Sequence, residues 1–449
     1  MNTNVIEGNP TKQFFIEMIT RDISIEDAIL DLIDNSIDGA ININPNNFSG
    51  LEIKLKISPD YFIIEDNCGG FSLITAQKYA FRFGRPESAP IPQNTIGRFG
   101  IGMKRSLFKM GKDFIVESQH HQDHFKVSVD VDLWSKKKTT ISQDGGEQFE
   151  IDDWNFDYEI INDRQMRKDG TIIHITQLND EVKDLFNDDS FKYQLKENIK
   201  RILNFSLQKG IRIYVNNEEL SGEKIDILMS DTILPYQCSG NYDGVQYKIV
   251  AGLGEIGAPK ASGWYIYCND RLVLEADQTM LTGWGVENVP KWHNDYVMFR
   301  GLLFLDSSET LKLPLTTTKK GIDATSAVYK AMLPIMKNAM QKILPFLRSI
   351  SQNKGNEANE FRQLLCDTLT HVSVCDIKTY AFSYQEKMFF PPLLDSDAVS
   401  RTRNNVRIAY DIPINDADIA KEYTDTKSYK ELGLYTFKYF WGKEGLENG

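Results

Sequence analysis

One segment near the N-terminus, residues 24–40, has two different helical faces, and this pattern constrains the fold most. Ser24 followed by Asp27 has the spacing of a capping box, which begins helices. Apolar residues recur at helical spacing and form one face: Ile25, Ala28, Ile29, Leu32, Ile33 and Ile37. Acids and an amide recur on another face: Asp31, Asp34, Asn35 and Asp38. We therefore expect a helix over residues 12–40, which Gly39 can end.

The acid and amide face allows two interpretations. Such a stripe is most often a solvated helix surface. It is also suited to Mg²⁺, which prefers oxygen ligands and needs only one or two protein groups when phosphates and waters complete its shell.

Composition limits the class of protein. The chain has 449 residues, which predicts two or three domains. Acidic residues outnumber basic ones, 63 to 51, so the net charge of -12 does not support broad DNA binding, although a local basic patch at 136–138 leaves it possible. No apolar run approaches the roughly 20 residues of a membrane span, so we expect no membrane partner. A polar N-terminus and scattered cysteines favour a cytoplasmic protein without zinc or disulfides.

The rest of the chain alternates between strand and helix patterns. Apolar and charged residues alternate over 51–57, as in a half-buried strand, and Gly and Pro predict a loop over 84–97. Further strands are expected at 61–64, 113–118, 125–133, 171–176, 211–215, 247–251, 264–267 and 297–305. Helices are expected at 191–203 and 324–347, and a linker at 351–355.

Two glycine-bearing segments are candidates for ligand contacts. Asp66-Asn67-Cys68-Gly69-Gly70-Phe71 follows a short strand, and its glycines would let a flat ligand approach the backbone, although a plain turn has the same composition. Gly97-Arg98-Phe99-Gly100-Ile101-Gly102-Met103-Lys104 opens a helix, where bare N–H groups bind anions. Gly170-Thr171, which opens a strand, has no meaning alone.

In their order and spacing, residues 31–40, 66–71, 97–104 and 170–171 resemble the first, second, third and fourth motifs of the GHKL superfamily. This superfamily includes gyrase, the ninety-kilodalton heat-shock chaperones, histidine kinases, MutL and MORC proteins. The resemblance covers residues 15–180. The combination of motifs and chain length is most similar to that of bacterial MORC-like or chaperone-like ATPases. It implies an α+β chain with a Bergerat-type α/β sandwich domain at 1–185, whose lid spans about 72–96. An α/β transducer-like domain would follow at 186–350, and a small mixed C-terminal region at 351–449.

The resemblance also implies roles for individual residues. Asn35 would hold Mg²⁺, Asp66 would accept a hydrogen bond from the adenine amino group with support from Thr171, and Lys104 would bind phosphates. The implied ATP-contacting residues are Asn35, Asp38, Asp66, Gly70, Phe71, Gly97, Gly100, Ile101, Gly102, Met103, Lys104 and Thr171. Asp31 falls where the family has its general base, usually a glutamate, and is shorter by one bond, roughly 1.5 Å. Cys68 replaces a glycine of the second motif.

A lysine of the second domain is a further candidate. In gyrase-like, MutL-like and MORC-like proteins the transducer domain extends a lysine to the ATP phosphates, and Lys319 matches that position better than Lys320. The alternative is an exposed turn with two lysines. His120, His121 and His124 indicate a solvated hairpin loop, because their spacing does not suit a metal site.

Two functional hypotheses follow. The first is a Mg²⁺-dependent ATPase that closes as a clamp or homodimer and acts with protein partners, in processes that include defence against foreign DNA. The second is a nucleotide-gated binding module with negligible turnover, which the short Asp31 suggests.

Overall fold

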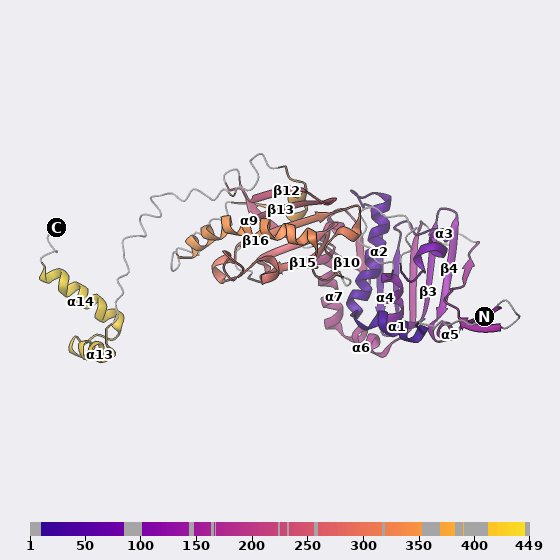
Figure 1. Cartoon of the computed structure of the whole chain (residues 1–449), viewed down its shortest axis with the longest axis horizontal. Coiled ribbons are helices and arrows are strands. Elements are labelled where there is room, and N and C mark those ends of the chain that lie inside the picture. The colour runs from indigo at the N-terminus through magenta and orange to yellow at the C-terminus, as the bar shows by residue number, and fades with distance from the viewer. Residues whose placement is uncertain are drawn as a thin grey trace, which may run out of the picture. The chain divides into compact units, whose positions relative to one another are not determined.

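The computed structural model describes residues 10–84, 101–142, 148–162, 166, 168–222, 225–230, 233–255, 259–316, 319–352, 369–381, 389 and 412–444. The chain separates into two compact units, Met1–Pro392 and Leu393–Gly449. Among its described residues, the first unit has two large sheets with their own helices, and a two-stranded hairpin (Figure 1). This is the α+β architecture expected from the sequence.

In the described residues, the first sheet has eight strands in the order β10-β9-β1-β2-β8-β3-β4-β7. Its strands are β1 Glu52–Ser58, β2 Tyr61–Asp66, β3 Gly111–His120, β4 Asp123–Asp130, β7 Tyr158–Ile160, β8 Gly170–Leu178, β9 Arg212–Val215 and β10 Glu218–Leu220. The β1–β9 pair is parallel and the other neighbours are antiparallel. The sheet therefore continues past residue 185, where we expected the first domain to end, because β9 pairs with β1. A separate hairpin comprises β5 Lys138–Ser142 and β6 Gln148–Asp152.

Helices cover one face of the first sheet (Figure 1). They are α1 Lys12–Arg21, α2 Ile25–Ile43, α3 Leu73–Thr75, the π-helix η1 Ala76–Ala80, α4 Gly102–Met110, α5 Val131–Lys136, α6 Asp180–Asn187, α7 Asp189–Ile202 and α8 Asn204–Gln208. The apolar face of α2 is fully buried in one core with the inward-facing residues of β1 and β2, such as Ile53 and Ile64. This packing exploits the two periodicities of helix and strand.

The single helix expected over residues 12–40 is wrong in two respects. The chain breaks between α1 and α2, where Ser24 Oγ accepts a hydrogen bond from the Asp27 amide at 3.1 Å and caps α2. Gly39 does not end α2, which continues to Ile43. Its small size serves packing instead, because a Cβ at Gly39 would lie 2.5 Å from the carbonyl oxygen of Cys68.

Most of the expected strands are confirmed, but the one at 125–133 is too long. β4 ends at Asp130, whose side chain accepts a hydrogen bond from the Leu133 amide at 2.9 Å. This contact caps α5, so residues 131–133 are helical although their apolar character suited a strand.

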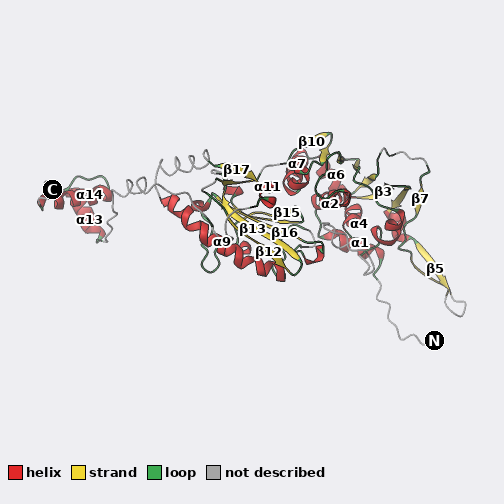
Figure 2. Ribbon diagram, turned by 90° about the horizontal axis from the view of Figure 1, so that it is seen from above, coloured by secondary structure: helices red, strands yellow, loops and turns green. Residues whose placement is uncertain are grey.

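The second sheet has the order β15-β14-β16-β13-β11-β17, with β12 paired to β13, in the part of the chain that the structure describes. The strands are β11 Asp226–Met229, β12 Tyr236–Tyr242, β13 Val245–Leu253, β14 Gly263–Cys268, β15 Arg271–Asp277, β16 Phe299–Asp306 and β17 Thr370–Ser373. Short 3-10 helices lie between them: η2 Pro259–Ala261, η3 Met280–Thr282, η4 Asn294–Tyr296 and η5 Thr310–Lys312. The helix α9 Ala327–Gln352 packs on one face and α11 Val374–Thr379 on the other (Figure 2). Residues 351–352 of the expected linker therefore belong to α9, and residues 353–355 lie outside the described residues.

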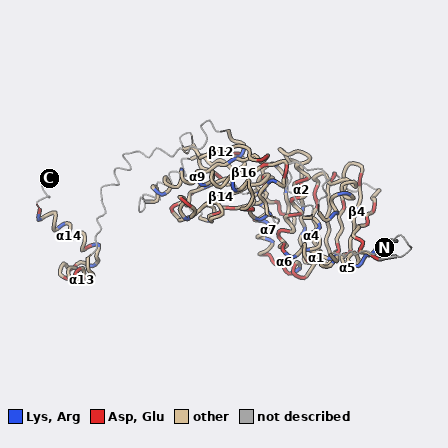
Figure 3. Tube along the Cα trace, viewed as in Figure 1, with Lys and Arg blue, Asp and Glu red and all other residues tan. Residues whose placement is uncertain are grey.

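The second unit contains the helices α13 Ile414–Tyr423 and α14 Tyr429–Lys443 among its described residues. Acidic and basic residues are interspersed along the described chain (Figure 3). No described helix is both long and apolar enough to cross a membrane.

Candidate functional site

The acid and amide face of α2 divides into buried and exposed groups. Asp31 and Asp34 retain only 3% and 0% of their surface, whereas Asn35 is exposed and Asp38 is partly buried. Because a buried carboxylate is unfavourable unless it is paired, the two aspartates cannot be a solvated helix face. The solvated interpretation is therefore wrong for Asp31 and Asp34.

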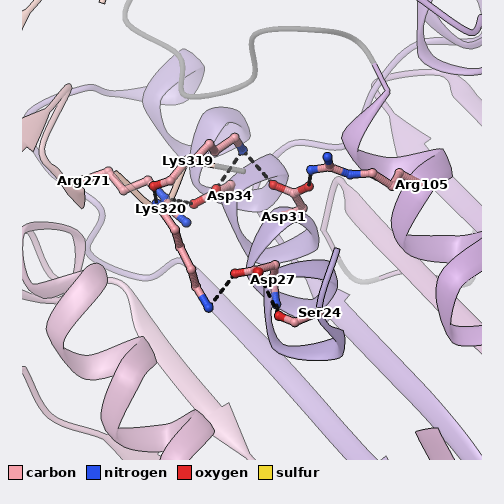
Figure 4. Close-up of polar contacts among 8 residues, drawn as sticks. All are labelled: Ser24, Asp27, Asp31, Asp34, Arg105, Arg271, Lys319 and Lys320. Carbon is pink, nitrogen blue, oxygen red and sulfur yellow. Dashed lines mark hydrogen bonds and ion pairs between the residues drawn. The ribbon is translucent and has the colours of Figure 1, made fainter. Parts of the chain in front are cut away.

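Asp34 is paired with two cations from the second sheet and the segment that follows it (Figure 4). Arg271 Nε on β15 lies 3.0 Å from Asp34 Oδ1, and Lys319 Nζ lies 2.8 Å from Asp34 Oδ2. Arg271 Nη1 also donates to the carbonyl oxygen of Lys319 at 3.0 Å. Burial acts to raise the pKa of Asp34, but the two cations outweigh burial and hold this pKa below its usual value.

Asp31 also has a cation on each oxygen (Figure 4). Arg105 Nη2 on α4 lies 2.6 Å from Asp31 Oδ2, and Lys319 Nζ lies 3.1 Å from Asp31 Oδ1. A Cβ at Gly102 would lie 3.4 Å from Asp31 Oδ2, so the start of α4 closely approaches this carboxylate. Asp31 is therefore held between the glycine-rich motif and the lysine of the second domain.

Lys319 is buried, at 8% exposure, and its backbone has a φ of 56°, which is unusual for a residue with a side chain. Burial lowers the pKa of Lys319, but the charges of Asp34 and Asp31 raise it above its usual value. Lys320 is exposed and instead forms an ion pair with the partly buried Asp27, with Nζ 2.7 Å from Oδ1. Of the two lysines, only Lys319 contacts the buried acids of α2.

Asp66 ends β2 as a hydrogen-bonded, largely enclosed carboxylate. Its Oδ2 accepts from Ser36 Oγ at 2.8 Å and its Oδ1 from the Cys68 amide at 2.9 Å. Thr171 is its cross-strand partner and adds a backbone hydrogen bond. Burial nevertheless raises the pKa of Asp66 to about 6. Asp66 and Thr171, which are far apart in the sequence, are thus brought together as expected.

The second motif turns sharply after Asp66. Gly70 has a φ of 58°, and a Cβ there would lie 2.2 Å from the carbonyl oxygen of Gln119, so only glycine fits. The Phe71 amide donates to Ser118 Oγ at 2.9 Å, which fixes the exit from this turn. Cys68 is buried at 2% exposure and burial raises the pKa of its thiol, so it is a packed residue without thiolate character.

The third motif is described only in part, because Gly97 and Gly100 lie outside the described residues. Ile101 precedes α4, and Met103 packs against the core. Lys104 is buried at 2% exposure, and its Nζ donates to the carbonyl oxygen of Ala80 at 2.6 Å. Burial lowers its pKa to about 7. The described start of the expected lid, which includes η1, is thus attached to the motif lysine, and 85–96 lie outside the described residues.

Sequence reasoning gave no role to Arg105, Arg271 or Ser36. Arg105 directly follows Lys104 and Ser36 directly follows Asn35, so their adjacency to motif residues could have indicated a place in the site. Arg271 had none, since only the fold brings β15 to α2.

Of the three clustered histidines, His120, His121 and His124, only some match the expected solvated hairpin loop. His121 has a φ of 53° at the tip between β3 and β4. His124 is buried at 6% exposure, with Nε2 2.7 Å from Glu117 Oε1, so the solvated interpretation is wrong for it. Among the described residues, no group of three His, Cys, Asp or Glu side chains could hold a metal ion.

Comparison with known proteins supports the nucleotide-site interpretation. The sequence model of the family described as Histidine kinase-, DNA gyrase B-, and HSP90-like ATPase matches residues 23–158. The chain matches no curated protein. The matched residues include α2, Asp66 and α4, so this part of the chain is similar to the ATPase domain that this family describes, and the similarity supports ATP binding.

Proposed function

We propose that this protein binds ATP with Mg²⁺ and hydrolyses it, using closure of its two sheets around the nucleotide as an ATP-gated clamp. The observation that carries this proposal is the contact of Lys319 with Asp31, because it brings a cation from the segment after β16 and η5 to α2, the helix that carries the first motif. ATP binding alone would require only the first sheet. A buried cation from a second layer offers a means of linking the nucleotide to domain movement.

The residues present fit adenine and Mg²⁺. Asp66 is a carboxylate acceptor beside the Gly70 turn, suited to a base amino group. Asn35 has an exposed carboxamide one helical turn after Asp31, and its oxygen would be the protein ligand of Mg²⁺. Phosphates and waters would supply the remaining ligands, and the ion would offset phosphate charge. Gly102 and Lys104, at the N-terminus of α4, would contact the phosphates.

In hydrolysis, the Asp31 carboxylate would accept the proton of the attacking water, giving ADP, inorganic phosphate and a proton released later to solvent. Lys319 would exchange one of its two carboxylate partners for the terminal phosphate and offset the charge that develops there. Asp34 and Arg271 would hold the lysine in place through the contacts described above.

Homodimer formation, protein partners and a role in defence against foreign DNA belong to the same proposal and rest on the family resemblance. Light scattering with and without a non-hydrolysable ATP analogue tests the dimer. We expect the mass to double with the analogue, and a monomer in both states would contradict it.

The alternative is a nucleotide-gated binding module with negligible turnover. It is favoured by one observation: both oxygens of Asp31 already contact cations, which leaves it less free to accept a proton. Steady-state phosphate release with Mg²⁺ decides between the two functions. Turnover that Asp31→Asn removes supports the ATPase, and ATP binding without turnover, with or without partners, supports the module.

A further inference from the structure

A cavity of about 620 Å³ lies where α7 meets the second sheet. Its volume is within the range of about 300–1,000 Å³ that is typical of small-molecule sites. The walls come from α7, β11, β14, β15, β16 and the residues around η2. None of its described lining residues belongs to the four motifs of the nucleotide site.

The feature that sets the chemistry of this cavity is Arg300, on β16. Arg300 is 6% exposed, and its Nη1 donates to the hydroxyl of Tyr265 at 2.9 Å. Its Nε is buried and has no hydrogen-bond partner among the described residues. The guanidinium lies against Gly254, where a Cβ would be 2.8 Å from Nε. No described acid lies within ion-pair distance of Arg300, although four carboxylates line the same cavity, so this buried guanidinium has no direct counter-charge among the described residues.

The acids that line the same cavity contact other basic side chains, and none of these described acids pairs with Arg300. Glu275 pairs with Arg201 at 2.9 Å, and Glu197 accepts from Lys200 at 2.7 Å. Asp226 and Glu255 both lie 3.4 Å from His371 Nδ1. An additional cation, Lys260, is exposed at the edge of the cavity. The cavity therefore combines a buried arginine with a rim lysine, and two of its four described carboxylates, Glu275 and Glu197, already pair with cations.

We propose that this cavity binds a small phosphate-bearing molecule, with the phosphate on Arg300 and Lys260, at a site separate from the nucleotide site. A guanidinium presents paired N–H donors that match phosphate oxygens, and burial strengthens such charge-assisted bonds. The Tyr265 hydroxyl donates to the carbonyl oxygen of Ala261 at 2.8 Å, so it is fixed as an acceptor for Arg300 and orients the guanidinium.

Strand β15 connects this cavity to the residues proposed for ATP hydrolysis. Glu275 and Ala276 of this strand line the cavity, and Arg271, at its start, contacts Asp34 and Lys319. Four residues of strand span about 13 Å. A ligand that orders this end of β15 would thus influence the segment that holds Lys319.

Equilibrium dialysis of the full chain with radiolabelled inorganic phosphate tests the site, in the presence of a saturating non-hydrolysable ATP analogue that fills the nucleotide site. We expect one equivalent of phosphate to be retained. Arg300→Gln should weaken its binding at least about tenfold, and Lys260→Gln several-fold. Arg21→Gln, which removes an exposed arginine at the end of α1, is the matched control and should leave binding unchanged.

Absence of retained phosphate in the wild type would overturn the proposal, as would equal affinity in Arg300→Gln. Phosphate that is retained without the ATP analogue but not with it would lie in the nucleotide site, and this result would also overturn the proposal. Should Arg300→Gln fail to fold, the exposed Lys260→Gln decides, because its loss of affinity supports the site and unchanged affinity contradicts it. Failure of this experiment leaves ATP hydrolysis untouched, since the two are measured independently.

Discussion

Lys319 Nζ lies 3.1 Å from Asp31 Oδ1, so the lysine expected to reach the ATP phosphates contacts the acid expected to activate water. The same ammonium is 2.8 Å from Asp34 Oδ2. Because this lysine is buried between two carboxylates, its charge is fixed in place rather than mobile on a long exposed side chain. The arrangement is preorganised for charge stabilisation.

Loss of the Asp31 carboxylate should lower ATP hydrolysis without lowering ATP affinity. We expect Asp31→Asn to retain ATP affinity and to lose most turnover, since the amide cannot accept the proton of water. Lys319→Ala should lower turnover by a factor of about 10² to 10³ and affect binding less. Phosphate release and calorimetric binding, measured on the same preparations, check both. Wild-type turnover in Asp31→Asn would remove this acid from the mechanism, and Asp31→Glu is the control that keeps a carboxylate.

Arg271 should act by positioning Lys319. We expect Arg271→Gln to lower kcat while KM for ATP changes little, because Arg271 touches Asp34 and the Lys319 carbonyl but no motif residue that binds the base. Arg271→Lys should restore only part of kcat, since one ammonium cannot make both contacts at the same geometry. The exposed variant Arg21→Gln serves as the control. An unchanged kcat in Arg271→Gln would contradict this role.

The buried network should contribute strongly to stability. Asp34→Ala leaves two buried cations without their shared counter-charge, so we expect a loss of about 3–5 kcal/mol in the free energy of unfolding. Lys183→Ala, which removes an exposed ion pair with Asp180, should cost at most about 1 kcal/mol. Urea unfolding of the three proteins measures the difference. Equal midpoints for wild type and Asp34→Ala would show that the network contributes little.

Binding of ATP should depend on pH through Asp66. Burial raises the pKa of Asp66 to about 6, so the carboxyl group becomes protonated as the pH falls through that value, and a protonated carboxyl is a weaker acceptor. For folding, protonation acts in the opposite direction, because the folded state binds the proton more tightly than the unfolded one and gains stability as the pH falls. The ratio of wild-type to Asp66→Asn affinity should fall below pH 6, while titration of the ATP phosphates cancels. A ratio that is constant with pH would contradict this.

Lys104 should take up a proton when phosphates bind. Burial lowers its pKa to about 7, so much of the population is neutral at slightly alkaline pH, and a nearby phosphate would favour the charged form. The calorimetric enthalpy of ATP binding at pH 8 should therefore depend on the ionisation enthalpy of the buffer. Lys104→Met should remove most of this dependence. Identical buffer dependence in both proteins would assign the proton uptake to another group.

Local patterns predicted the elements whose residues interact with near neighbours in sequence. The alternation at 51–57 and the capping residues Ser24 and Asp27 correspond to β1 and α2, because strand and helix periodicity are local properties. The prediction that Gly39 ends the helix is wrong because a glycine is needed there for the close approach of the Cys68 carbonyl oxygen, which is distant in sequence. The helical turn at 131–133 depends on a cap from Asp130, which the apolar pattern does not reveal.

The sequence predicts the site residues that lie within the four motifs. It does not predict the partners that reach these residues only through the tertiary fold. Asp66 and Thr171 meet because β2 and β8 pair, and the order of the motifs anticipated this. The burial of Asp34 and its partner Arg271 depends on the junction of α2 with β15, for which the sequence near Arg271 has no periodic or compositional signal.

The most direct measurement of the central claim is calorimetric titration of the wild type and Asp66→Asn with ATP and Mg²⁺. The account predicts saturable binding to the wild type and affinity at least tenfold lower in Asp66→Asn, about 1.4 kcal/mol, because an amide would place a donor against the adenine amino group. Ser36→Ala, which removes one hydrogen bond to the same carboxylate, should give a smaller loss. Equal affinity of wild type and Asp66→Asn, or no binding to the wild type, would contradict the assignment of this nucleotide site.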